Sequence, residues 1–185
     1  RERLHPNFQI SINRSPLQFR SGPERQAQWL QQLALAEVRN LGLAMEITEG
    51  LLLSGDLLAR RQLQALREAG ISIALDDFGT GYSSLASLQQ HQIDCLKIDR
   101  SFVRPLNQDG RELALCRAII SLAHELGMSV VAEGVETEIQ ARLLTDIGCD
   151  YAQGYWFASP MDAAALERWL AQRGLPPSSS SVDDR

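Results

Sequence analysis

Apolar and polar residues alternate in six short stretches of the chain, and each stretch is followed by residues with helical spacing. The strand pattern occupies residues 8–13, 43–49, 71–77, 94–99, 129–133 and 151–157. Apolar residues recur three or four positions apart, as in helices, over 24–41, 57–69, 83–90, 111–126, 138–147 and 162–172. Because strands that alternate with helices are typical of parallel βαβ units, we expect one parallel sheet with helical connections.

The residues near the strand ends separate two folds that both fit this alternation, a doubly wound open sheet and a (β/α) barrel. A polar residue stands near the end of every strand: Asn13, Glu46, Asp76 with Asp77, Lys97, Glu133 and Gln153. Two positions earlier, on the same face, the residues are mostly small, and the opposite face is bulky and apolar. An open sheet gathers its ligands at one switch point, whereas a barrel carries functional groups around its C-terminal rim. We therefore expect a (β/α)8 TIM-like barrel, of which about six C-terminal βα units are present.

The length of the chain also bears on the barrel. A whole barrel takes about 250 residues, and this chain has 185 and begins at Arg1 without a methionine. We expect roughly two further strands before Arg1, and we expect the open sheet edges to make the isolated 185 residues unstable. Residues 1–174 are predicted to form the domain, and 175–185, rich in serine and proline, a disordered tail or linker.

The composition of the chain argues against a membrane or a nucleic-acid polymer as its partner. The chain is 44% hydrophobic and 22% charged, as in ordinary globular proteins. Its apolar runs are too short for a bilayer, and no signal peptide is visible in these residues. The net charge of -5 and the lack of a basic stripe argue against a nucleic-acid polymer as partner. Three widely separated cysteines fit a reducing compartment. We expect a cytoplasmic location, or the cytoplasmic part of a membrane-anchored protein, and no membrane contact by this segment.

The adjacent carboxylates Asp76 and Asp77 end an apolar strand and are followed by Gly79 and Gly81. Neighbouring side chains of a strand point to opposite faces, so the two can share a target only if the chain leaves the strand there. The glycines tolerate the backbone angles that such a turn needs. An ordinary turn whose aspartates cap the next helix fits the same residues.

The strand-end carboxylates form a set with the chemistry of a metal site. Glu46, Asp76, Asp77 and Glu133 would repel one another if they converged without positive charge, and divalent ions remove that repulsion. Oxygen ligands without histidine or cysteine favour Mg²⁺ or Mn²⁺ over zinc. The adjacent aspartates can flank two ions, an arrangement that cleaves phosphodiesters.

Lys97 lies between Cys95 and Asp99 on the face assigned to the interior. A buried lysine needs partners, so we interpret it as aligning an attacking water or holding a phosphoryl oxygen. A structural ion pair with a strand-end carboxylate is the alternative. The Asp-Phe-Gly triplet at Asp76–Gly79 occurs in kinases, but the chain has neither a glycine-rich phosphate loop nor a His-Arg-Asp loop.

These motifs together resemble the EAL-domain family of cyclic-di-GMP phosphodiesterases. The matching stretches are Ile12-Asn-Arg-Ser-Pro16, Glu46-Ile-Thr-Glu49, Asp76-Asp-Phe-Gly-Thr-Gly-Tyr-Ser-Ser84, Leu96-Lys-Ile-Asp-Arg-Ser-Phe102, Ala132-Glu-Gly-Val-Glu136 and Gln153-Gly-Tyr155. The resemblance implies a modified (β/α)8 barrel that hydrolyses cyclic-di-GMP to linear pGpG with two Mg²⁺ or Mn²⁺ ions.

The resemblance also implies a role for each site residue. Asn13, Glu46 and Asp76 resemble the ligands of one ion, Asp76 and Asp77 serve the second, and Glu133 is a further metal ligand. Lys97 resembles the group that aligns the water, and Gln153 and Glu136 resemble pocket residues. Glu49 is similar to the glutamate that steadies the Asp77-to-Tyr82 loop, which in this family is linked to dimer contacts.

One signature is absent from these residues. The Glu-Ala-Leu tripeptide, which supplies a metal ligand, is expected before Arg1. An intact site implies an enzyme, whereas a degenerate site implies a receptor that binds cyclic-di-GMP and relays the signal to an attached domain. The resemblance further implies a homodimer through the barrel and an attached sensory or GGDEF domain in the parent protein.

Overall fold

The computed structural model describes residues 8–20, 23–35, 42–53, 56–79, 88, 91–107 and 110–172, and every structural statement below refers to them. The strands are β1 (Ile10–Asn13), β2 (Leu43–Thr48), β3 (Ser72–Phe78), β4 (Cys95–Ile98), β5 (Ser129–Ala132) and β6 (Tyr151–Ala152). The helices are α1 (Pro16–Arg20), α2 (Pro23–Leu35), α3 (Glu49–Leu53), α4 (Leu57–Glu68), α6 (Arg100–Val103), α7 (Arg111–Glu125), α8 (Glu138–Asp146) and α9 (Ala163–Gln172).

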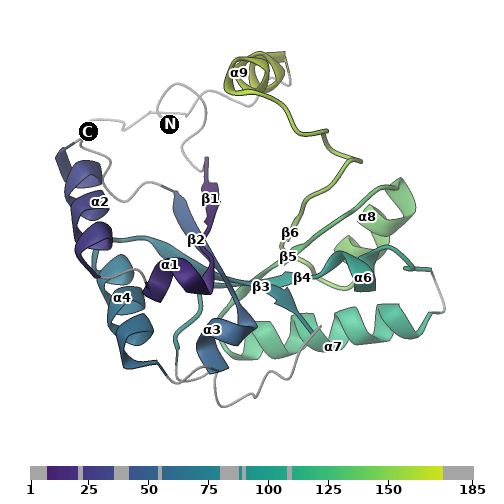
Figure 1. Ribbon diagram of the computed structural model, residues 1–185. Coiled ribbons are helices and arrows are strands. Elements are labelled where there is room, and N and C mark those ends of the chain that lie inside the picture. Colours follow the sequence, from purple (N-terminus) through teal and green to yellow (C-terminus); the bar gives the residue numbers. More distant parts are fainter. Residues whose placement is uncertain are drawn as a thin grey trace, which may run out of the picture.

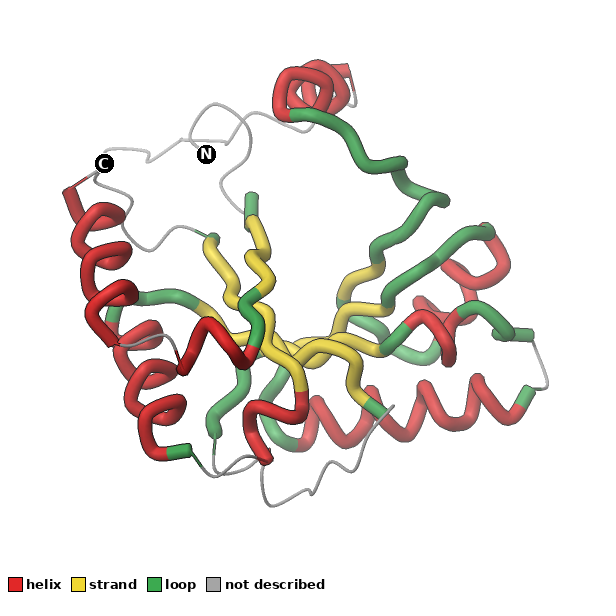
Figure 2. The backbone as a smooth tube through the Cα atoms, in the orientation of Figure 1, coloured by secondary structure: helices red, strands yellow, loops and turns green. Residues whose placement is uncertain are grey.

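The six strands form one parallel sheet in the order of the sequence, β1 to β6. The sheet curls, so that its two edge strands face each other across the open side, and the helices lie outside the curl (Figure 1). Figure 2 shows the same arrangement, with the strands at the centre and the long helices around them. The prediction of a partial barrel is confirmed, because the six parallel strands of the described residues form a curled half-barrel.

The two faces of the sheet differ as the sequence pattern predicts. The residues that face the helices are almost fully buried: Ile47, Leu75, Leu96, Ile98, Val130 and Ala132. They belong to one continuous apolar core, to which α4 contributes Leu63 and Leu66 and α7 contributes Ile120. The strand ends that carry polar groups lie on the other face, because side chains alternate along a strand. The core therefore lies outside the curl and leaves the inner face for chemistry.

Side chains fix where several helices begin. Asp56 accepts a hydrogen bond from the Leu58 backbone at the start of α4, and Asp99 does the same for Ser101 at the start of α6. Thr137 and Gln140 form a reciprocal capping box at the start of α8. Caps of this kind satisfy backbone donors that a helix leaves unpaired. The chain that leaves β4 and β5 is thus anchored immediately after the site residues.

The structure corrects several of the elements predicted from the sequence. The sixth strand was predicted over 151–157 but ends at Ala152. The chain turns there because Gly154 packs against the Val135 backbone, so closely that a Cβ atom would lie 2.2 Å from the Val135 oxygen. The short helices α1, α3 and α6 were not predicted, and Glu49 begins α3 rather than ending β2.

Some predictions fall on residues outside the described part of the chain. They include the C-terminal end of the helix over 24–41, nearly all of the helix over 83–90, and the tail over 175–185. None of the helices in the described ranges has the length and apolar character needed to span a bilayer.

Candidate active site

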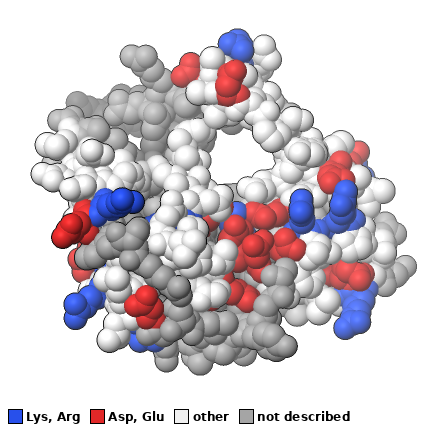
Figure 3. Space-filling model, viewed as in Figure 1, with Lys and Arg blue, Asp and Glu red and all other residues white. Residues whose placement is uncertain are grey.

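Lys97 is the centre of the site. Its ammonium Nζ lies 2.7 Å from Glu46 Oε2, 3.0 Å from Asp76 Oδ1 and 2.5 Å from Glu133 Oε1. These residues come from β4, β2, β3 and the end of β5, so the curl of the sheet is what brings them together. The space-filling view shows acidic side chains gathered at the centre of this face, beside an opening (Figure 3). The polar strand ends that the sequence singled out therefore do converge.

The charges of this cluster do not balance. Burial alone would lower the pKa of Lys97, but hydrogen bonds to Glu133 and Glu46 outweigh it and raise the pKa above its ordinary value. Burial raises the pKa of Glu133, and the charges of Asp76 and Glu46 raise it further, although Lys97 opposes them. One ammonium thus faces three carboxylates, and excess negative charge remains for another cation to neutralise.

Asp77 joins the cluster through an irregularity of β3. Its φ of 56° is left-handed, and the pairing of β3 with β4 shifts register between Leu75 and Phe78. Such a bulge turns a side chain that would otherwise point to the far face, and aspartate tolerates the conformation better than most residues. The sequence interpretation assigned this turn to the glycines that follow. In the structure the left-handed backbone begins at Asp77 itself, the strand continues to Phe78, and Gly79 then takes the positive φ, 94°, that the sequence interpretation gave to the glycines.

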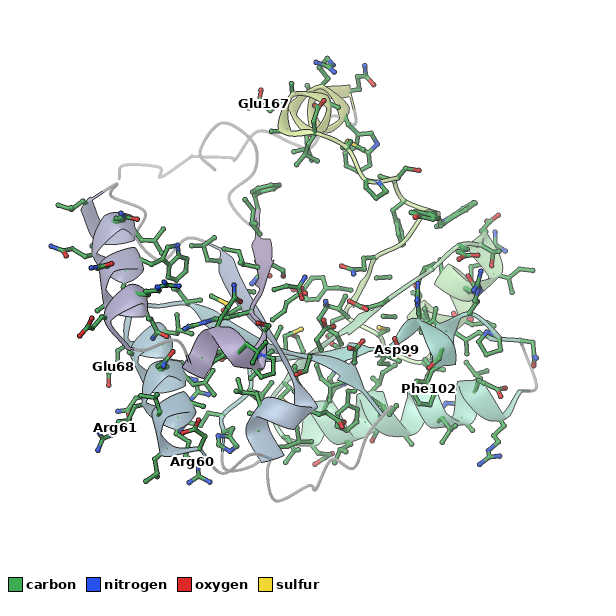
Figure 4. All side chains as sticks on the ribbon, in the orientation of Figure 1. Arg60, Arg61, Glu68, Asp99, Phe102 and Glu167 are labelled. Carbon is green, nitrogen blue, oxygen red and sulfur yellow. The ribbon has the colours of Figure 1, made fainter. Side chains whose placement is uncertain are left out.

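The segment after Asp77 is held from two sides. The Gly79 backbone N–H donates to Glu49 Oε1 at 3.3 Å, and Glu49 is buried. On the other side a Cβ atom at Gly79 would lie 3.0 Å from the Phe102 ring, so a larger residue at position 79 would push that ring aside. Phe102 and Asp99 both lie at α6 (Figure 4). Residues 80–82, the rest of the Asp77-to-Tyr82 loop that Glu49 is predicted to steady, lie outside the described ranges.

Phe102 and Asp99 were not predicted as site residues. Partial burial and the charges of Asp76 and Asp99 raise the pKa of Asp77. Asp99 therefore adds negative potential to the cluster while it caps α6. The signal that could have found both residues is their place directly after β4, where a barrel strand delivers its chain to the rim.

The remaining predicted residues divide into two groups. Gln153 Nε2 donates to Glu133 Oε1 at 2.9 Å, and Asn13 pairs in register with Glu46, so both lie beside the cluster. The Glu136 side chain is 44% exposed, and its carboxylate lies 3.9 Å from Arg104, which is also exposed. The structure thus brings Asn13 and Gln153 to the site and leaves Glu136 at its periphery.

The donor set fits a divalent metal. Oxygen atoms of Asp76, Asp77 and Glu133 all lie within 4.8 Å of one another. Asp76 Oδ1 is buried and makes no hydrogen bond of good geometry to the described residues, although the Lys97 ammonium is near. Buried carboxylate oxygens with spare acceptor capacity are the ligands that Mg²⁺ and Mn²⁺ prefer.

Comparison with known proteins agrees with this arrangement. The EAL domain family matches residues 1–160. The chain belongs to the EAL-domain family. The family that the sequence motifs suggested is thus confirmed.

Curated EAL relatives are much longer than this chain. The cyclic di-GMP phosphodiesterase NbdA of Pseudomonas aeruginosa is 44% identical over 128 residues, which are 69% of this chain and 16% of that protein. The cyclic di-GMP phosphodiesterase PdeR of Escherichia coli is 43% identical over 125 residues, 68% of this chain and 19% of that protein. The oxygen sensor protein DosP of Escherichia coli is 37% identical over 162 residues, which are 88% of this chain and 20% of that protein. The chain thus spans about a fifth of the length of these relatives.

Solved EAL structures share the fold. The EAL domain of Mycobacterium smegmatis DcpA superposes with a TM-score of 0.81 at 36% identity, covering 92% of this chain and 76% of that one. The PaMucR phosphodiesterase in complex with c-di-GMP superposes with a TM-score of 0.79 at 36% identity, covering 86% of this chain and 70% of that one. Klebsiella pneumoniae BlrP1 in a manganese/cy-diGMP complex superposes with a TM-score of 0.75 at 34% identity, covering 83% of this chain and 39% of that one. The half-barrel is therefore part of the EAL TIM barrel.

Proposed function

We propose that this EAL domain hydrolyses cyclic-di-GMP to linear pGpG in a metal-dependent reaction. The observation that carries the proposal is the convergence of Glu46, Asp76 and Glu133 on the buried Lys97 ammonium, with Asp76 Oδ1 left without a good hydrogen bond. Relatives that match most of this chain are named cyclic di-GMP phosphodiesterases, and similar EAL structures hold that ligand. These likenesses support the proposed substrate and reaction class.

The metal ligands are the strand-end oxygens. Asn13, Glu46 and Asp76 would hold one Mg²⁺ or Mn²⁺ ion, Asp76 and Asp77 a second, and Glu133 adds a further ligand. The chemistry that these ions supply when bound is activation of the attacking water and stabilisation of the charge on the leaving oxygen.

The chain's own residues orient the reacting groups. In the reaction the water oxygen bonds to phosphorus, one phosphorus–oxygen ester bond breaks, and the leaving oxygen takes up a proton. Lys97 donates a hydrogen bond to the attacking water or to a phosphoryl oxygen, and its carboxylate contacts fix its position. Gln153 holds Glu133 through their 2.9 Å hydrogen bond, and Glu49 holds the chain after Asp77 through Gly79. Gln153 and Glu136 border the substrate pocket.

The parent protein is proposed to carry further domains. The relatives are several times longer than this chain, and one of them is named an oxygen sensor. We infer that a sensory or GGDEF domain regulates the EAL site and that the barrel forms a homodimer in the cytoplasm. Gel filtration with light scattering of the full-length protein tests the dimer.

Product analysis tests the proposed reaction. The full-length protein is incubated with cyclic-di-GMP and Mg²⁺ or Mn²⁺, and the products are separated by chromatography and weighed by mass spectrometry. We expect pGpG, abolished by EDTA and by Asp76→Asn. Asp146→Asn is the matched control, because Asp146 is exposed at the end of α8, and it should leave the rate unchanged. Tight binding without turnover in either metal would instead make the domain a receptor.

A further inference from the structure

The end of β1 carries Asn13, one of the proposed metal ligands. β1 is four residues long and, in the described part of the chain, pairs with β2, so that Asn13 lies opposite Glu46. The position of Asn13 relative to Glu46 therefore depends on how the chain directly after it is held.

Arg14, the next residue, is anchored in three ways. Its backbone N–H donates to the Glu46 backbone carbonyl oxygen at 3.0 Å and so extends the ladder past Asn13. Its side chain reaches the helical layer, where Nη1 donates to Gln26 Oε1 at 2.5 Å and Nη2 donates to Gln62 Oε1 at 2.6 Å. Its guanidinium carbon lies 4.0 Å above the centre of the Phe19 ring. One residue thus ties the end of β1 to α1, α2 and α4.

The two glutamines are built to receive this guanidinium. Gln26 and Gln62 are 5% and 3% exposed. Gln26 Nε2 donates to the Gln62 backbone oxygen at 2.7 Å, and Gln62 Nε2 donates to the Phe19 backbone oxygen at 2.7 Å. Because both amide nitrogens are engaged, both amide oxygens are fixed toward Arg14. Removal of the guanidinium would leave two buried acceptors without a donor.

The partners of Arg14 are neutral. Within the described ranges no carboxylate forms an ion pair with it, and burial lowers its pKa. The planar guanidinium of Arg14 therefore contributes mainly through its two hydrogen bonds, one from each terminal nitrogen, and not through its charge alone. Lysine offers a single ammonium and cannot reproduce this geometry.

We propose that Arg14, clamped by Gln26 and Gln62, is a positioning residue that holds Asn13 beside Glu46 and so sets the affinity of the site for its divalent ion. The inference rests on the proposed metal-dependent function. It assigns Arg14 no contact with substrate or metal. Loss of a residue that orients a metal ligand weakens metal binding or activity by about 10-fold to 100-fold.

Arg14→Met tests the proposal in the full-length protein. Methionine keeps an apolar stem beside Phe19 and removes the guanidinium. Mn²⁺ binding is measured by electron paramagnetic resonance well below the melting temperature, and the half-saturating Mg²⁺ concentration is measured in the hydrolysis assay. Arg61→Met is the matched control, because Arg61 is an exposed residue of α4, next to Gln62 (Figure 4).

The expected result is a Kd for Mn²⁺ raised about 10-fold in Arg14→Met, a similar rise in half-saturating Mg²⁺, and a smaller change in kcat at saturating metal. Arg61→Met should match the wild type in all three. Arg14→Lys serves as a second folded variant, and we expect a Kd between those of the wild type and Arg14→Met.

Two outcomes contradict the inference and are distinct. If folded Arg14→Met, or folded Arg14→Lys where the methionine variant does not fold, binds Mn²⁺ as tightly as the wild type, Arg14 is structural only. The proposed function then stands unchanged. If the wild type itself binds no Mn²⁺, the proposed function and this inference fall together.

Discussion

Replacing Lys97 with methionine probes the charge balance of the site directly. The variant keeps an unbranched stem and removes the ammonium that contacts three carboxylates within 3.0 Å. The Lys97 and Glu46 side chains are each 6% exposed, so water screens their interaction little. Removing one partner of a buried ion pair costs about 3–5 kcal/mol, because the remaining charge is left uncompensated. We expect Lys97→Met to lower the free energy of unfolding by that amount in EDTA.

Added metal should then separate the two roles of Lys97. If the carboxylates form a metal site, Mg²⁺ replaces the lost positive charge and restores much of the stability, as measured by denaturation in urea with Mg²⁺ and with EDTA. Hydrolysis should stay at least about 100-fold below the wild type even at saturating Mg²⁺, because the donor that orients the reacting groups is gone.

The control is Arg142→Met. Arg142 pairs with Glu138 on the surface of α8, its side chain is 75% exposed, and its loss should change stability by less than about 0.5 kcal/mol. If Lys97→Met is as stable as the wild type in EDTA, the reasoning about buried charge is refuted. If it loses stability but keeps full activity, Lys97 is only a structural ion-pair partner.

Three further predictions concern other parts of the chain. Glu49→Ala should lower the rate of hydrolysis about tenfold and leave Mn²⁺ affinity within about twofold, because it frees Gly79 but none of the proposed ligands of the first ion; an unchanged rate removes that role. Gly154→Ala should cost about 1–3 kcal/mol, because its Cβ would meet the Val135 backbone at 2.2 Å, and an unchanged urea midpoint would contradict this packing. Burial raises the pKa of Asp150, but hydrogen bonds from His124 and the Val130 N–H outweigh it and lower the pKa overall. The stability that Asp150 adds is therefore present above its unfolded pKa of about 3.9 and lost as the pH falls through the lower folded value. The stability difference between the wild type and Asp150→Asn should shrink between pH 5 and pH 2, and a constant difference would contradict it.

The sequence predicted the sheet and most of the site because both depend on simple periodicities. A period of two separates the two faces of each strand, so the placement of Cys95 and Lys97 on one face and of Leu96 and Ile98 on the other could be read directly. Parallel βαβ units bring the ends of their strands to one rim. The convergence of Glu46, Asp76 and Glu133 on Lys97 follows from these two facts.

Other features could not be predicted because they depend on contacts between distant segments. The bulge at Asp77 interrupts the period of two within a strand whose pattern is otherwise regular. Helices of four or five residues, such as α1 and α6, are too short to show a helical period. The turn at Gly154 is set by its close packing against the Val135 backbone.

The most direct test of the central claim is to locate the metal. Crystals of the full-length protein grown with cyclic-di-GMP and Mn²⁺ are measured at a wavelength where manganese scatters anomalously. We predict peaks about 2 Å from the carboxylate oxygens of Asp76, with Asp77 and Glu133 beside them. A map with ordered cyclic-di-GMP in the barrel and no anomalous peak at these carboxylates would contradict the account.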